Sequence, residues 1–184
     1  MNRTQMAIIE AFWKILEEKP YSKITVKDIV EYCNVNRNTF YYHFHDIFEL
    51  LDCILKQDVD QIIQNCGQID DPIVCLKIII QSISKRKSAF LHIYHSVNKE
   101  TFLKELDRLA FYCVNEYANS ATENLLVISQ DKDLLIKFYK CAFVGIILDW
   151  LDHDMNYDLV ASCQRISNLF NGAAKKAYLK SIYK

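Results

Sequence analysis

Hydrophobic residues recur at helical spacing from the start of the chain. Four apolar residues lie on one face of a helix expected over residues 4–18: Ile8, Phe12, Ile15 and Leu16. This i, i+4, i+7, i+8 pattern is typical of an amphipathic helix with one buried face. Thr4 is expected to cap the helix. Pro20 should end it, because the residue before a proline disfavours helical dihedrals.

Two shorter helices follow, joined by a tight turn. Thr25, with Asp28 three residues later, is close to a capping box and predicts the start of the first one. Asn34 is expected in the left-handed conformation, which Asn tolerates better than other non-glycine residues. Asn36 then caps a second helix over residues 37–44. Two short helices joined by such a turn predict a helix-turn-helix.

The remainder of the chain is also predicted to be helical. A longer helix starts at Asp46 and runs to about residue 65, and further helices are expected over 72–85, 88–97, 99–127, 131–153 and 157–181. Residues 125–128 are the one short run with strand character. Three glycines and two prolines in 184 residues leave little room for tight turns, which excludes all-β folds, collagen and repeat arrays. The predicted fold class is therefore all-α.

The charge of the whole chain indicates no partner, because its formal net charge is −1. Locally, residues 19–45 hold four basic and two acidic side chains, which forms a thin basic patch. The seven cysteines form no CxxC pair and no zinc-finger spacing, and neither a signal-peptide pattern nor an 18-residue apolar stretch occurs. We therefore expect a cytoplasmic protein that neither binds a membrane nor requires a cofactor. His92 and His95 lack a third ligand at recognisable spacing, so no metal is predicted.

Residues 4–51 resemble the DNA-binding domain of the tetracycline-repressor (TetR) family of bacterial transcription regulators. Three segments carry the resemblance: Ile24–Ile29, Asn34–Phe44 and Glu49–Leu51. The chain departs from the family at two places. Asn34 stands where the family usually has glycine, and Ile47 stands where it commonly has a lysine beside the DNA backbone.

The resemblance implies two domains. Residues 1–46 would form an N-terminal helix-turn-helix domain of three helices, and residues 47–184 a C-terminal helical bundle for dimerisation and effector binding. It further implies a sequence-specific regulator, expected to be a repressor, that binds a palindromic operator in double-stranded DNA as a homodimer. A small molecule or a protein would act as the effector.

Side-chain chemistry suggests how the second short helix would contact DNA. Arg37 can pair bidentately with guanine and Asn38 with adenine if the helix N-terminus enters the major groove. Tyr41 and His43 would donate to the DNA backbone. The full set of expected DNA-binding residues is Thr25, Lys27, Asn36, Arg37, Asn38, Thr39, Tyr41, Tyr42 and His43. The plain alternative is a solvated polar helix face that serves protein contacts.

Residues 133–181 look like the two helices that form the dimer interface in the family. Ala142 and Gly145 would allow another helix to approach closely. The expected interface residues are Phe138, Ala142, Gly145, Ile146 and Trp150. The resemblance also implies an effector pocket, although aromatic residues at helical spacing more often belong to a core. The aromatic residues of the middle helices expected to line it are Phe90, Tyr94, Phe111, Tyr112 and Tyr139.

Two other classes of function compete with a DNA-binding regulator. An enzyme is not predicted, because the chain has no nucleophile elbow, no phosphate-binding glycine loop and no catalytic Cys–His signature. The second class is a helical adaptor or co-regulator that acts through protein partners and binds DNA weakly. The thin basic patch and Ile47 favour it, and binding to a palindromic duplex at physiological salt would separate it from the regulator.

Overall fold

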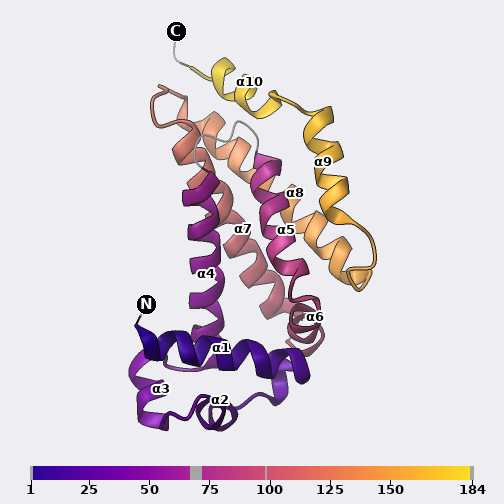
Figure 1. Cartoon of the computed structure of the whole chain (residues 1–184). Coiled ribbons are helices and arrows are strands. Elements are labelled where there is room, and N and C mark those ends of the chain that lie inside the picture. The colour runs from indigo at the N-terminus through magenta and orange to yellow at the C-terminus, as the bar shows by residue number, and fades with distance from the viewer. Residues whose placement is uncertain (1, 67–71, 98, 183–184) are drawn as a thin grey trace. The chain divides into compact units, whose positions relative to one another are not determined.

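A computed structural model describes residues 2–66, 72–97 and 99–182 (Figure 1). The described residues form ten α-helices and one short 3-10 helix. Their bounds are α1 Arg3–Glu18, the 3-10 helix Tyr21–Lys23, α2 Val26–Tyr32, α3 Arg37–His43, α4 Ile47–Cys66, α5 Pro72–Ser84, α6 Lys87–Ser96, α7 Lys99–Ala121, α8 Ser129–Asp152, α9 Leu159–Leu169 and α10 Ala173–Lys180. The predicted all-α class is confirmed.

The chain divides into two compact units. The first comprises Met1–Asp58 and Arg86–Phe102, and the second comprises Val59–Lys85 and Leu103–Lys184. The sequence prediction ended the first domain at residue 46. In the structure the compact unit extends further because the start of α4 and the whole of α6 share its core.

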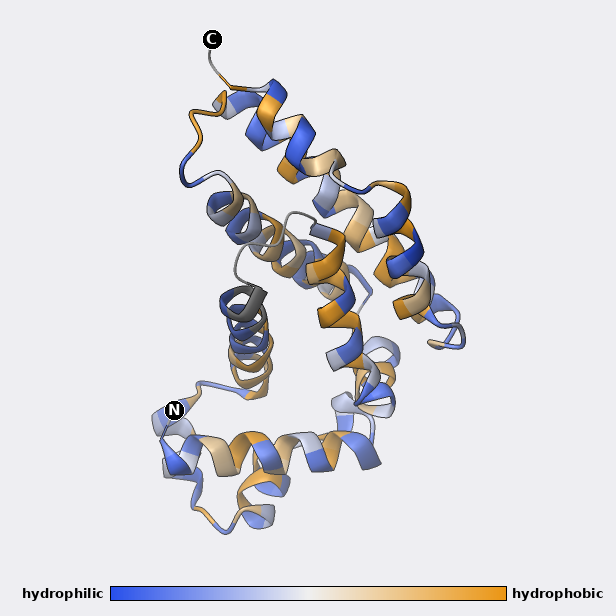
Figure 2. Ribbon diagram, turned by 45° about the horizontal axis from the view of Figure 1, so that its top comes forward, coloured by the Kyte–Doolittle hydropathy of each residue, from blue (hydrophilic) through white to orange (hydrophobic). Residues whose placement is uncertain are grey.

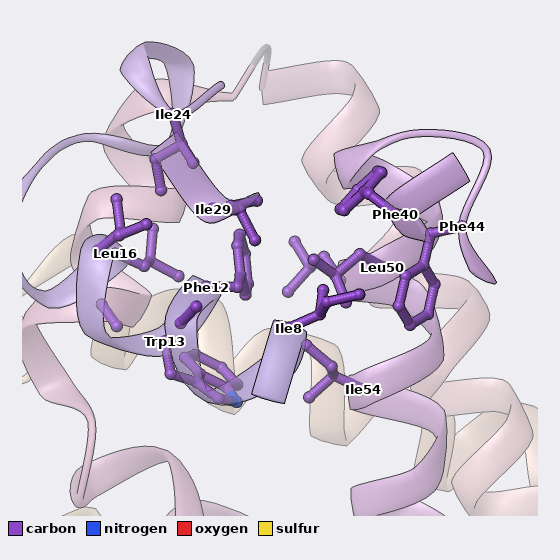
Figure 3. Close-up of a cluster of buried hydrophobic side chains, with 14 of the residues drawn as sticks. Ile8, Phe12, Trp13, Leu16, Ile24, Ile29, Phe40, Phe44, Leu50 and Ile54 are labelled. Atoms are coloured by element: carbon purple, nitrogen blue, oxygen red, sulfur yellow. The ribbon is translucent and has the colours of Figure 1, made fainter. Parts of the chain in front are cut away.

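The core of the first unit is built around α1. Figure 3 shows buried side chains from α1, α2, α3 and α4 gathered in one cluster: Ile8, Phe12, Trp13, Leu16, Ile24, Ile29, Phe40, Phe44, Leu50 and Ile54. In Figure 2 the ribbon of α1 alternates between hydrophobic and hydrophilic colours, as an amphipathic helix does. The predicted inward pair Phe40 and Phe44 lies in this cluster, with ring centroids 5.8 Å apart. Ile47 packs against it too, which explains how an apolar residue is accommodated there.

Helix α6 belongs to the same core, although it lies more than forty residues beyond α3 in sequence. Its Ala89 and Ile93 are buried with the side chains of α1. His92 Nδ1 lies 2.8 Å from the carbonyl oxygen of Leu16, at the C-terminal end of α1. The imidazole thus contacts one of the carbonyls that a helix end leaves without an intrahelical partner.

The turn between α2 and α3 has the predicted conformation. Asn34 has φ 54°, in the left-handed region, and the amide of Val35 donates to the carbonyl of Val30 at 3.0 Å. Asn36 caps α3 as expected. The cap of α1 differs from the prediction: Asn2 takes this role rather than Thr4, in a capping box with Gln5. Asn2 lies two residues earlier, and its Oδ1 accepts from the Gln5 amide at 2.8 Å, so the helix already begins at Arg3.

The second unit contains the later part of α4, α7 from Leu103 onward, and the whole of α5, α8, α9 and α10. Helix α5 packs on α9, and Lys77 Nζ donates to Gln164 Oε1 at 2.5 Å across them. Lys140 of α8 pairs with Asp107 of α7 at 2.5 Å. None of the helices in the described part of the chain is long and apolar enough to cross a membrane.

Two predicted helices are shorter than expected. The helix predicted over 99–127 ends at Ala121, and Val127 then forms an isolated antiparallel bridge with Ile182. The strand character of residues 125–128 thus corresponds to this single bridge. The helix predicted over 157–181 is two helices, because Gly172, at φ 71°, turns the chain between α9 and α10.

Candidate nucleic-acid interface

Helix α3 presents a polar face to solvent and an aromatic face to the core. Arg37, Asn38 and Tyr41 are exposed, and Tyr42 is 84% exposed. Phe40 is fully buried on the opposite side, and its ring meets that of Tyr41 edge-on at 5.6 Å. The packing of Phe40 therefore fixes the direction in which the exposed side chains project.

Three of the predicted DNA-binding residues are engaged in helix caps. Asn36 Oδ1 accepts from the Thr39 amide at 2.8 Å and from Thr39 Oγ1 at 3.0 Å. Thr25 Oγ1 accepts from the Asp28 amide at 3.2 Å and donates to its carboxylate at 2.7 Å. These side chains position α2 and α3. The exposed polar face of α3 is left to Arg37, Asn38, Tyr41 and Tyr42, while His43 is half-buried.

A charged cluster surrounds the start of α2. Asp28 Oδ2 accepts from Thr25 N at 2.8 Å and lies 2.8 Å from Lys19 Nζ. The hydrogen bond from Lys19, followed by those from Thr25, lowers the pKa of Asp28 to about 2. Lys27 lies 3.6 Å from Glu31 on the exposed face of α2. Two of the four cations in the predicted basic patch thus have carboxylate partners.

The start of α4 carries a second pair of carboxylates. Asp46 Oδ1 accepts from the Glu49 amide at 2.8 Å, which lowers the pKa of Asp46. Glu49 Oε2 accepts in turn from the His45 amide at 2.5 Å. Among the described residues, Arg37 and Lys23 are the cations of this surface without an ion-pair partner. Its positive charge is therefore concentrated on two side chains.

A separate apolar surface lies on α8 in the second unit. Leu134 and Phe138 are 65% and 63% exposed, and Cys141 and Gly145 continue the same helical stripe. A Cβ placed at Gly145 would meet no other atom within 4 Å. These residues form what we term the α8 stripe: Leu134, Phe138, Cys141 and Gly145.

Trp150 differs from the other predicted interface residues. Its side chain is 3% exposed, and its Nε1 donates to the Tyr157 carbonyl at 3.0 Å. It thereby closes the turn from α8 to α9 and is a core residue of its own chain, with no surface left for a partner. Ala142 and Ile146 are half-buried beside the α8 stripe.

The five aromatic residues expected to line an effector pocket divide between the two units. Phe90 and Tyr94 belong to the first, where the Phe90 ring lies 5.8 Å from Trp13. Phe111, Tyr112 and Tyr139 belong to the second. Phe111 is 49% exposed, and the Tyr112 hydroxyl donates to Asp60. Phe90 is thus a packing residue of the first unit.

Sequence reasoning missed the contacts that attach α6 to α1. Arg86 places its guanidinium carbon 4.4 Å from the centre of the Trp13 ring, and His92 contacts Leu16 as described above. No periodic pattern identifies them, because they join segments about seventy residues apart. Nowhere in the described ranges do three or more His, Cys, Asp or Glu side chains gather in a way that could hold a metal ion.

Two family models match this chain. The model described as "Bacterial regulatory proteins, tetR family" matches residues 8–53. The model described as "Transcriptional regulator C-terminal region" matches residues 70–172, more than half of the chain.

Individual proteins also resemble this chain in sequence or in fold. An uncharacterized HTH-type transcriptional regulator, YxbF of Bacillus subtilis, is 26% identical over 160 residues, which cover 82% of this chain and 40% of that protein. The HTH-type dhaKLM operon transcriptional activator DhaS of Lactococcus lactis is 34% identical over 62 residues, 34% of this chain and 33% of that protein. The matched segments thus cover less than half of the length of these two relatives. The solved structure of the dihydroxyacetone kinase operon activator DhaS has the same fold, with TM-score 0.68, 20% identity and coverage of 95% of this chain and 97% of that one.

The cluster around Asp28 predicts a pH-dependent contribution to stability. A carboxyl whose pKa is lower in the folded than in the unfolded chain stabilises the fold above about pH 4, and loses this effect as the pH falls toward 2. Asp28→Asn should therefore lower the free energy of unfolding at pH 7 by about 1 kcal/mol, the usual contribution of a cap. The difference from wild type should shrink below pH 4. Urea unfolding followed by circular dichroism across this range measures it.

Lys19→Gln is the matched control, because it removes the charge partner and leaves the Thr25 hydrogen bonds to Asp28 in place. It should give a smaller pH-dependent loss. A difference between wild type and Asp28→Asn that stays constant from pH 7 to pH 2 would contradict this account of the cluster.

Proposed function

Because this chain belongs to the TetR family of bacterial transcription regulators, we propose that it binds a specific DNA sequence through α3. The observation that carries the proposal is the division of α3 into a buried aromatic face and an exposed face of Arg37, Asn38, Tyr41 and Tyr42. Side chains that project from a rigid support are what base recognition in the major groove requires.

The exposed residues of α3 differ in the contacts that they can make. Arg37 has a planar fork of donors that matches the O6 and N7 acceptors of guanine, and Asn38 can pair with adenine. Tyr41, Tyr42 and His43 would donate to the phosphate backbone, with Lys27 from α2. Thr25, Asn36 and Thr39 contribute by fixing the first turns of α2 and α3, where backbone amides face the phosphates.

The few unpaired positive charges around α2 and α3 favour a modest affinity for DNA of random sequence. Non-specific affinity grows with the number of phosphates that a protein neutralises. Lys19 and Lys27 are already paired with Asp28 and Glu31, and Ile47 provides no cation at the start of α4. We infer that specificity for this protein depends more on base contacts than on a strong general attraction to DNA.

We propose that the protein is a homodimer formed through the α8 stripe. Large apolar side chains with exposures above 60%, arranged at helical spacing, are an unfavourable surface for a monomer in water. Leu169 and Phe170, at the end of α9, are two further exposed apolar side chains of the second unit. A two-fold interface of α8 and α9 from each copy would give a four-helix arrangement and allow two copies of α3 to bind a palindrome.

Effector control is the third part of the proposal. The second unit matches the regulator C-terminal model over most of its length, and a small molecule or a protein bound to it would act as the effector. Such an effector can change DNA binding only by binding two conformations of the dimer with different affinity. The resemblance in sequence favours repression, whereas DhaS is named an activator; measuring transcription of a target gene with and without the protein decides the sign.

The alternative is a helical adaptor that acts through protein partners. The paired cations around α2 and the half-buried Ile47 favour it, because both reduce the positive charge available to phosphates. The exposed Arg37 and Asn38 at the start of α3 favour the DNA-binding function, which we therefore adopt.

Arg37→Ala tests base recognition. If Arg37 contacts a guanine, the substitution should weaken binding to the preferred duplex by about 1–3 kcal/mol and relax the preference at one base pair. Tyr41→Phe, from the same exposed face, should weaken binding to all sequences nearly alike. Fluorescence anisotropy with preferred and scrambled duplexes measures both. Equal losses for Arg37→Ala on the two duplexes would exclude the base contact.

Phe138→Glu tests the dimer, and Phe111→Glu is its matched control. Both residues are exposed phenylalanines of the second unit, but only Phe138 lies in the α8 stripe. Phe138→Glu, and likewise Gly145→Leu, should raise the monomer fraction in analytical ultracentrifugation and lower DNA affinity, because a charge or a bulky group would enter the interface. Phe111→Glu should remain dimeric. A fully dimeric Phe138→Glu protein would place the interface elsewhere.

A further inference from the structure

Arg86 makes an unusual contact for a residue at the start of a helix. It occupies the N-cap position of α6 but forms no side-chain hydrogen bond to the helix. Instead its guanidinium lies over the ring of Trp13 in α1, 4.4 Å from the ring centre. Trp13 is itself buried and contacts Phe90, one turn into α6. Arg86 and Phe90, which lie one helical turn apart, thus both contact the Trp13 ring.

Arg86 is also the first residue of the segment by which the chain re-enters the first unit. The chain leaves the first unit after Asp58 and returns to it at Arg86. Asp58 is a half-buried residue of α4. Burial raises its pKa above the usual value, and the positive charge of Arg86 reduces this rise. The two residues at which the chain crosses between the units therefore interact electrostatically, and one of them is stacked on α1.

Trp13 and the support of α3 belong to one buried cluster. Trp13 and Phe12 are neighbours in α1, with ring centroids 5.8 Å apart. Phe12 lies in the same buried cluster as Phe40 of α3 (Figure 3). Phe40 in turn sets the direction of the exposed side chains of α3. A change in the position of α6 on α1 would thus act on the support of α3.

We propose that Arg86 is a positioning residue for DNA binding: stacked on Trp13, it holds α6 on α1 where the chain enters the first unit, and so fixes the support of α3. Its effect on DNA rests on the proposed function. Arginine suits this role because its planar, weakly hydrated cation stacks on indole while keeping its charge. Lysine has a compact, strongly hydrated charge and should replace it only in part.

The simpler alternative is that Arg86 contributes packing to the fold and nothing more. In that case its removal would lower the melting temperature without changing the dynamics of α6 in the folded protein. A positioning role predicts a local effect at temperatures where the protein is fully folded. The two alternatives therefore differ in a measurement made far below the melting temperature.

Hydrogen exchange of the full-length protein without DNA is the first test. Arg86→Gln should raise amide exchange several-fold in α6 and in the second half of α1, while α9 in the second unit exchanges as in wild type. Arg86→Lys should be intermediate. The exposed neighbour Lys85 provides the matched control, because Lys85→Gln removes the same charge one residue away. Wild-type exchange in α6 of Arg86→Gln would overturn the proposal.

DNA binding is the second test, with a duplex that the wild-type protein selects from a random pool. Arg86→Gln should lower affinity for this duplex about tenfold at a temperature where the variant is fully folded, and Lys85→Gln should leave it unchanged. Wild-type affinity of Arg86→Gln would overturn the effect on DNA binding. A wild-type protein that selects no duplex would contradict the proposed function instead, and the exchange experiment then decides the role of Arg86 by itself.

Discussion

Burial of the apolar face of α1 is the interaction on which the first unit depends. Ile8, Phe12 and Leu16 are fully buried in a cluster that also takes side chains from α2, α3, α4 and α6. Each large side chain removed from water contributes about 1.5–3 kcal/mol. Exposed ion pairs such as Lys27–Glu31 contribute about 0–1 kcal/mol. The core therefore decides the arrangement of the helices far more than the surface charges do.

The seven residues of α3 show why this support matters. A helix of this length is unstable in isolation, because helix nucleation is costly and few hydrogen bonds repay it. Phe40 and Phe44 anchor α3 to the core, and Asn36 satisfies the first amides. In the proposed function, recognition would thus depend on side chains that hold α3 in place as well as on those that face DNA. The same logic extends to Arg86, which acts on the support of α3 from the end of a distant segment.

The helix-turn-helix could be predicted from the sequence because its signals are local. Thr25, Asn34 and Asn36 lie within one or two residues of the backbone groups that they satisfy or the turn that they form. The membership of α6 in the first unit could not be predicted, since His92 and Leu16 are 76 residues apart. The burial of Trp150, in the helix of the candidate dimer interface, could not be predicted from the sequence either. The family resemblance suggested an interface position for Trp150, but its side chain is 3% exposed and donates to the carbonyl of Tyr157 within its own chain.

Recognition of a specific DNA sequence by paired copies of α3 is the core of the proposed function. Its most direct test is to recover and sequence the DNA that the purified protein retains from a pool of random duplexes at physiological salt. We expect enriched palindromes whose half-sites lie about 34–36 Å apart, or a multiple of this distance, with the same bases at the positions that Arg37 and Asn38 would contact. A retained pool with no enriched sequence, or with a single unrepeated site, would contradict it.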